Sequence, residues 1–195
     1  MSTILENTKG VHITSRGPYI GTYTGKKFYP LDIRESDIDI GDIAHALSNQ
    51  CRFAGHVKEF YSVAQHCCLV SDYFLTDIPL TSSAWRGLLH DASEAYLVDV
   101  PRPIKQIANF DTYREIEQKT QRAIYHKFGI YPYEDPTWLH DADNLLLATE
   151  ARDLMNDPGW CHQMPKAQMF ITGWSPSKAK TEFMKRFNKL GKEIL

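Results

Sequence analysis

The sequence predicts a mainly α-helical protein that carries a small β-hairpin near its N-terminus. Two observations predict this fold class. From residue 37 onward, apolar residues recur at helical spacing in successive stretches that are separated by Gly and Pro. Before that point, aromatic and polar residues alternate around a glycine turn. The chain has 195 residues, of which 43% are hydrophobic, so we expect one domain with a packed core.

The hairpin is expected between Tyr19 and Pro30, with its turn centred on glycine. Residues 1–36 as a whole are expected to be non-helical and to form an N-terminal extension. Residues 37–156 would form the helical core, and residues 157–195 a C-terminal segment that ends in a helix.

Six helices are expected after the hairpin. Asp37, Asp39 and Asp42 suit the start of the first, because carboxylates stabilise a helix N-terminus. Gly129 suits the end of the fourth, and Pro101 and Pro103 predict a non-helical stretch. The expected helices lie at residues 37–49, 62–74, 81–96, 111–128, 137–156 and 175–190.

Charge and cysteine content narrow the class of protein. The formal net charge is −2, so no general attraction to polymeric nucleic acid is expected. The four cysteines contain no CxxC pair, which argues against a zinc ribbon and favours reduced thiols in the cytoplasm. The N-terminus does not look like a signal peptide, and no apolar run is long enough to cross a membrane.

Three segments place metal-binding side chains in or at the end of apolar helices. They contain His66, the pair His90-Asp91, and Asp143. Imidazole nitrogens and carboxylate oxygens from several rigid elements are the ligands that a divalent metal prefers. Two histidines and two aspartates would leave positions open for water or a phosphate oxygen. These four residues are the candidate metal ligands.

The order of these residues resembles the HD phosphohydrolase superfamily, in which they ligate a divalent metal inside a helical bundle. A longer run resembles the bacterial 5′-deoxynucleotidases and phage dATP triphosphohydrolases of that superfamily. It begins with His90-Asp91-Ala92-Ser93-Glu94 and continues with Asp99, Pro101, Pro103 and Lys105 at the family's spacing. The resemblance covers most of residues 40–155, and it implies an HD-domain bundle and a homo-oligomer.

The resemblance also implies roles for individual residues. Glu94 and Asp99 would be catalytic and move protons. Arg52 and Lys105 would bind the phosphate, and Phe53 and Pro103 would line the sugar and base pocket. The family commonly has tryptophan beside this arginine where the chain has Phe53. The cofactor would be a divalent ion such as Zn, Co, Mn or Mg, and the substrate a deoxynucleotide.

The expected reaction is metal-dependent hydrolysis of the 5′-phosphate ester of a 2′-deoxynucleotide. The substrate is left open between a monophosphate and a triphosphate such as dATP. Alternatives are a cyclic-nucleotide or (p)ppGpp hydrolase, and a non-catalytic HD protein that senses nucleotides. A second HD pair, His140-Asp141, competes for the metal site. We favour His90-Asp91, because the apolar pair Leu88-Leu89 precedes it and Glu94 follows one helical turn later.

Overall fold

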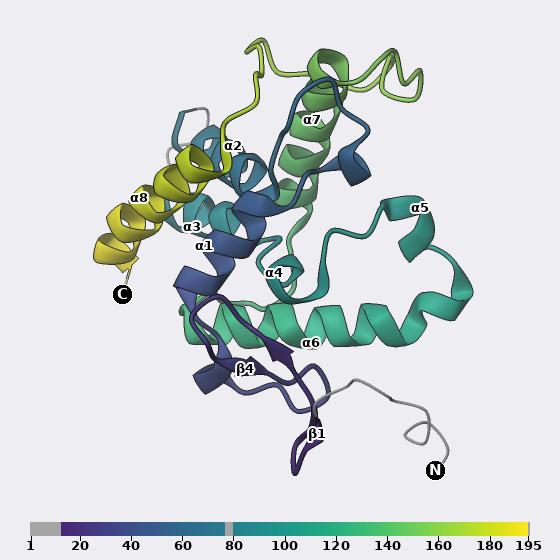
Figure 1. Ribbon diagram of the computed structural model, residues 1–195. Coiled ribbons are helices and arrows are strands. Elements are labelled where there is room, and N and C mark those ends of the chain that lie inside the picture. Colours follow the sequence, from purple (N-terminus) through teal and green to yellow (C-terminus); the bar gives the residue numbers. More distant parts are fainter. Residues whose placement is uncertain (1–12, 77–79, 195) are drawn as a thin grey trace.

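The computed structural model describes residues 13–76 and 80–194, and it confirms a mainly α-helical fold (Figure 1). Residues 1–12, which belong to the expected non-helical extension, lie outside the described residues. Each of the six expected helices overlaps an observed helix of nine residues or more in the described part. These are α1 (Ile40–Asn49), α2 (Val63–Thr76), α3 (Thr81–Leu89), α6 (Asp111–Lys127), α7 (Thr137–Leu154) and α8 (Pro176–Ile194).

The N-terminal region contains two short antiparallel ladders. The predicted hairpin is present as β3 (Ile20–Gly21) paired with β4 (Lys27–Phe28), and its turn contains Gly25 at a φ of +84°. A second ladder, β1 (Ile13–Thr14) with β2 (Gly17–Pro18), was not predicted. The following 3-10 turn η1 (Glu35–Asp37) lies against α6, where Lys127 donates to the Glu35 carbonyl at 2.9 Å.

Helix α2 lies at the centre of the bundle and packs against α1, α3, α7 and α8 (Figure 1). Its apolar residues are buried on nearly every side, which is typical of a central helix. Gly87 allows α3 to approach α2 closely, because a Cβ atom at that position would lie 3.0 Å from Cγ1 of Val70. This packing fixes α2, which contains His66, against α3, which His90 directly follows.

The prediction of one continuous helix over residues 81–96 is wrong for residues 90–93. Helix α3 ends at Leu89, residues 90–93 form turns, and α4 (Glu94–Leu97) follows. Gln121 of α6 stabilises this break: its side-chain amide donates to the Leu89 carbonyl at 2.7 Å and accepts from the Ser93 N–H at 3.0 Å. A side chain from another helix thus holds the backbone around His90 and Asp91.

The stretch after α4 also differs from the prediction. Val98 has a φ of +65°, which ends α4. A short helix, α5 (Arg102–Lys105), forms where Pro101 and Pro103 predicted none. Proline is compatible with the first turn of a helix, because the N–H groups there have no helical partner. The 3-10 turn η3 (Ala108–Phe110) leads into α6, and α5 stands out from the bundle in Figure 1.

In the described residues, no helix is both long enough and apolar enough to cross a membrane.

Candidate metal centre

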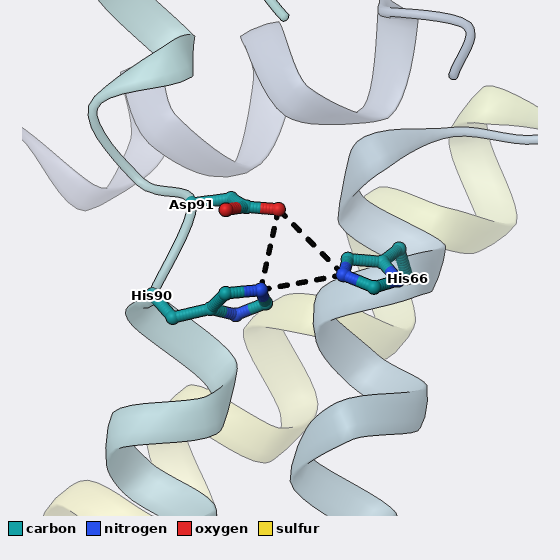
Figure 2. A group of neighbouring side chains, drawn as sticks. All are labelled: His66, His90 and Asp91. Carbon is teal, nitrogen blue, oxygen red and sulfur yellow. Dashed lines mark hydrogen bonds and ion pairs between the residues drawn. The ribbon is translucent and has the colours of Figure 1, made fainter. Parts of the chain in front are cut away.

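Three side chains from two helices and the turn after them converge inside the bundle (Figure 2). His66 comes from α2, His90 is the residue that caps the C-terminus of α3, and Asp91 follows it in the turn. The Nε2 atoms of the two histidines are 3.3 Å apart. Oδ2 of Asp91 lies 3.3 Å from the His90 nitrogen and 3.6 Å from the His66 nitrogen. Their potential ligand atoms all lie within 4.8 Å of one another.

The other ring nitrogen of each histidine is already engaged. Nδ1 of His90 lies 2.8 Å from the carbonyl oxygen of Gly87, which can only accept a hydrogen bond. Nδ1 of His66 lies 2.6 Å from Oε1 of the buried Glu150. Both Nδ1 atoms therefore carry the proton, and both Nε2 atoms are left to face the cluster. Metal-binding histidines are commonly oriented in this way.

Asp143 adds a second carboxylate from α7. Its Oδ1 lies 3.1 Å from Nε2 of His66, so the structure places all four predicted ligands at one point of the bundle. Its Oδ2 accepts from the guanidinium of Arg102 at 3.3 Å. One carboxylate thus links the histidine cluster to a cation on α5.

These residues fit a divalent metal. Two imidazole nitrogens and two carboxylates match the ligand types that Zn²⁺, Mn²⁺, Co²⁺ and Fe²⁺ accept. Because both Nδ1 atoms carry the proton, the lone pairs of the two Nε2 atoms face each other at 3.3 Å. This arrangement needs a proton or a cation between the two nitrogens. In addition, Oε2 of Glu94 is buried without a hydrogen-bond partner among the described residues, which is rare in a folded protein.

The electrostatics of the cluster favour charged side chains. Burial opposes ionisation of Asp91, but His90, His66 and Arg52 outweigh it and lower the pKa of Asp91. Burial also opposes ionisation of Asp143, yet its contact with His66 lowers the pKa of Asp143 to about 2. Desolvation disfavours the imidazolium of His90, but the adjacent Asp91 raises the pKa of His90 well above its usual value.

A buried ion network lies behind His66. Glu150 accepts hydrogen bonds from His66, from the Tyr61 hydroxyl at 2.8 Å and from Nε of Arg52 at 3.1 Å. Arg52 also reaches Oδ2 of Asp91 at 3.5 Å. Burial opposes ionisation of Glu150, but Arg52 and His66 lower its pKa. Arg52 therefore connects the carboxylate behind one ligand to the carboxylate of another.

Glu94 lies beside the cluster in a position suited to holding a proton. Burial, and then the charges of Asp91 and Asp99, raise the pKa of Glu94 well above its usual value. Its Oε1 contacts Nζ of Lys105 at 3.3 Å, while Lys105 also bonds Glu117 at 2.6 Å. Burial, with the charge of Asp91, also raises the pKa of Asp99.

One glutamine ties the two acidic residues together. Gln50, the residue after α1, donates from Nε2 to the Glu94 carbonyl at 2.9 Å. Its Oε1 accepts from the Asp99 N–H at 3.1 Å. The backbone between these points contains the left-handed residue Val98. Gln50 therefore fixes the spacing of Glu94 and Asp99 across a strained bend.

Two predicted pocket residues lie farther from the cluster. Phe53 has a φ of +56° and packs against Ala148, Ala151 and Cys161, although its ring lies 5.7 Å from the Arg52 guanidinium carbon. Pro103 is exposed on α5. Within the described part of the chain, neither side chain forms a hydrogen bond or an ion pair with the four candidate ligands, so their pocket roles stay predictions.

The competing pair, His140-Asp141, lies outside the cluster. Asp141 is exposed and lines a cavity of about 450 Å³ between α2, α7 and residues 164–165. Tyr73, Trp138 and Met164 also line this cavity. None of the four ligands does so, although Asn144, next to Asp143, contributes to its wall. The geometric preference for His90-Asp91 over His140-Asp141 is thus clear.

Comparison with known proteins shows the family but not an activity. The chain is 42% identical over 177 residues to Uncharacterized protein YfdR of Escherichia coli (strain K12), covering 88% of this chain and 95% of YfdR. The chain belongs to the YfdR family. Uncharacterized protein RCAP_rcc00048 of Rhodobacter capsulatus is 35% identical over 111 residues, 55% of this chain and 56% of that protein. No family model matches the chain.

Sequence reasoning missed several residues that this member of the YfdR family places around the ligands. Glu150 follows Asp143 by two helical turns on α7, inside an apolar run, so a carboxylate on the buried face was a usable signal. Arg102 carries no motif signal in the sequence that would place it beside Asp143. Gln50, Tyr61 and Gln121 carried no local signal, because their partners are distant in sequence.

Proposed function

We propose that this protein is a metal-dependent phosphohydrolase that cleaves the 5′-phosphate ester of 2′-deoxynucleotides. The observation that carries the proposal is the pair of Nε2 atoms of His66 and His90, 3.3 Å apart, with Asp91 and Asp143 beside them. His66, His90, Asp91 and Asp143 would hold the metal. A divalent cation bound there would supply Lewis acidity toward a phosphoryl oxygen and toward water.

The residues around the cluster support hydrolysis. Glu94, whose raised pKa favours the protonated carboxyl, is suited to exchange a proton at Oε2 during the reaction. Asp99, held by Gln50, is a second candidate for that role. Arg52 contacts Asp91 and Lys105 contacts Glu94, so both would supply positive charge toward a phosphate at this site.

The deoxynucleotide part of the proposal rests on the resemblance of residues 90–105 to the 5′-deoxynucleotidases and dATP triphosphohydrolases. A contact within that segment supports the idea that its residues act together, because Nζ of Lys105 contacts Oε1 of Glu94. Monophosphate and triphosphate substrates both remain within the proposal. We also propose a cytoplasmic site of action, because all four cysteines are free.

A panel assay tests this function. The purified protein is incubated with Mn²⁺, Co²⁺, Zn²⁺ or Mg²⁺ and with dNMPs, dNTPs, ribonucleotides, cyclic nucleotides and (p)ppGpp. We expect release of phosphate or triphosphate from deoxynucleotides. Asp91→Ala should be inactive, and Asp141→Ala, which changes the exposed carboxylate of the other HD pair, should keep full activity. Turnover of cyclic nucleotides or (p)ppGpp alone would contradict the proposed substrate class. Nucleotide binding without turnover would favour a sensor.

A further inference from the structure

Three cations lie near the candidate metal centre, and they differ in how accessible they are. The side chain of Arg52 is 9% exposed, that of Lys105 is 22% exposed, and that of Arg102 is 57% exposed. A phosphate that arrives from solvent must find donors that it can reach. Accessibility therefore singles out Arg102, which lies outside the residues that the resemblance assigns.

The hydrogen bonds of the three cations also favour Arg102 as the residue that an incoming anion can reach. Arg52 is engaged by Glu150 and Asp91, and the ammonium of Lys105 is engaged by Glu117 and Glu94. Glu150 and Glu94 are buried, and Asp91 and Glu117 are partly buried, so these ion pairs are costly to break in favour of a new partner. These two residues can contribute charge from inside the site, but the ammonium of Lys105 has one N–H left, and the remaining donors of Arg52 belong to a side chain that is only 9% exposed.

Arg102 keeps donors available. Its Nη1 donates to Asn144 at 3.0 Å and its Nη2 donates to Asp143 at 3.3 Å. A guanidinium has five N–H groups in a planar fork. Each terminal nitrogen retains a second N–H beyond these contacts, and Nε makes no hydrogen bond within residues 13–76 and 80–194.

The position of Arg102 connects it to the cluster. Asp143 places one oxygen 3.1 Å from His66 and the other 3.3 Å from Arg102. The guanidinium is therefore one carboxylate away from the candidate metal ligands. An anion bound by its free donors would lie at the edge of the same site.

We propose that Arg102 is the residue that receives the phosphate group of the substrate from solvent. This inference rests on the proposed function for its substrate class, a phosphate monoester or the terminal phosphate of a triphosphate. The matching geometry of guanidinium and phosphate oxygens favours two parallel hydrogen bonds. Residue 102 would then set affinity for the anion, whereas the four ligands set affinity for the metal.

The test compares Arg102→Gln and Arg102→Lys with Arg122→Gln. Arg122 is a matched control, because it is 53% exposed on α6 and pairs with Glu134 at 3.2 Å. Binding of inorganic phosphate to the Mn²⁺-loaded protein is measured by calorimetry, together with Mn²⁺ affinity and the KM for dAMP. Arg102→Gln should weaken phosphate binding and raise KM by about 10- to 100-fold, Arg102→Lys by less, and Arg122→Gln should change neither.

The outcomes separate this inference from the function. Phosphate binding that depends on Arg102, without turnover of any nucleotide, would defeat the proposed function and leave the anion site standing. Turnover with unchanged phosphate affinity and KM in Arg102→Gln would overturn the inference and leave the function standing. Failure of the wild-type protein to bind phosphate would also overturn it. A change in Mn²⁺ affinity alone would show that Arg102 only holds Asp143.

Discussion

His66 and Glu150 form a 2.6 Å hydrogen bond between Nδ1 and Oε1 at the centre of the bundle, where neither side chain is exposed. This contact sets the direction of the His66 ring, so that Nε2 faces His90 and Asp143. It also brings Arg52 and Tyr61 to the same carboxylate. The geometry of the candidate metal centre therefore depends on a residue that does not belong to the proposed ligand set.

Replacing Glu150 by Gln should weaken metal binding without removing a ligand. The amide cannot supply the negative charge that His66 and Arg52 share, and we expect Mn²⁺ affinity to fall by about 10- to 100-fold. Isothermal titration calorimetry measures this change. Glu115→Gln is the control, because Glu115 is exposed on α6. Equal Mn²⁺ affinity in Glu150→Gln and wild type would show that the contact does not orient the ligand.

Metal affinity should rise with pH. Burial lowers the pKa values of His66 and His90, and Arg52 also lowers that of His66, but neighbouring carboxylates outweigh these effects and raise both pKa values; protons on these rings therefore compete with a metal. A metal must displace those protons from Nε2, and its binding therefore becomes more favourable as the pH increases. Titrations with Mn²⁺ between about pH 6 and pH 8 should show this trend with proton release. An affinity that stays constant over this range would be inconsistent with protonated histidines.

Glu94→Gln should stabilise the metal-free protein while it lowers activity. Burial and two neighbouring aspartates raise the folded-state pKa of Glu94 above the unfolded value of about 4.3. The unfolded chain therefore loses this proton at lower pH, and the stability that Glu94 contributes declines as the pH rises through the folded-state pKa. Glutamine mimics the protonated form, so unfolding free energy at pH 7.5 should increase by about 1 kcal/mol.

Urea unfolding in the presence of EDTA measures this effect, and the gain should shrink as the pH approaches the unfolded-state pKa of Glu94. Glu117→Gln provides a comparison, since Glu117 bonds the same lysine but lies outside the cluster. A stability of Glu94→Gln equal to or below that of wild type at pH 7.5 would mean that the Lys105 contact outweighs the repulsion by Asp91 and Asp99.

Gln50→Ala should affect turnover more than metal binding. Gln50 holds the backbone of Glu94 and Asp99, but it contacts none of the four ligands through its side-chain hydrogen bonds. Small displacements of proton-transfer groups strongly lower the rate of the chemical step. We therefore expect kcat to fall by about 10- to 100-fold with Mn²⁺ affinity unchanged. Gln118→Ala, at an exposed position of α6, is the control. Parallel losses of kcat and Mn²⁺ affinity would assign Gln50 a general structural role.

The helices and the hairpin were predictable because their signals are local. Apolar spacing located α2 and α7, and Gly25 marked the hairpin turn that β3 and β4 flank. The break after Leu89 was not predictable, because a side chain 32 residues away, that of Gln121, replaces the helical hydrogen bonds. Helix α5 was missed because Pro103 was treated as a helix breaker rather than as a first-turn residue.

In the candidate site too, some residues were predictable from the sequence and others were not. The four candidate ligands could be chosen from the sequence because the residue types, their order and the run from Glu94 to Lys105 carry the pattern. The network behind them could not, since Tyr61, Arg52 and Glu150 meet only after α2 and α7 pack. The engagement of Lys105 by Glu117 also depends on how α5 returns toward α6, which spacing alone does not determine.

Metal binding by wild type, Asp91→Ala and Asp141→Ala decides whether His90-Asp91 belongs to a metal centre. Each protein is stripped with chelator, titrated with Mn²⁺ or Zn²⁺, and analysed by calorimetry and by elemental analysis after desalting. We expect one tightly bound ion per chain in wild type and Asp141→Ala, and loss of that ion in Asp91→Ala. Binding that survives in Asp91→Ala but disappears in Asp141→Ala would contradict this expectation, as would a wild-type protein that binds neither ion.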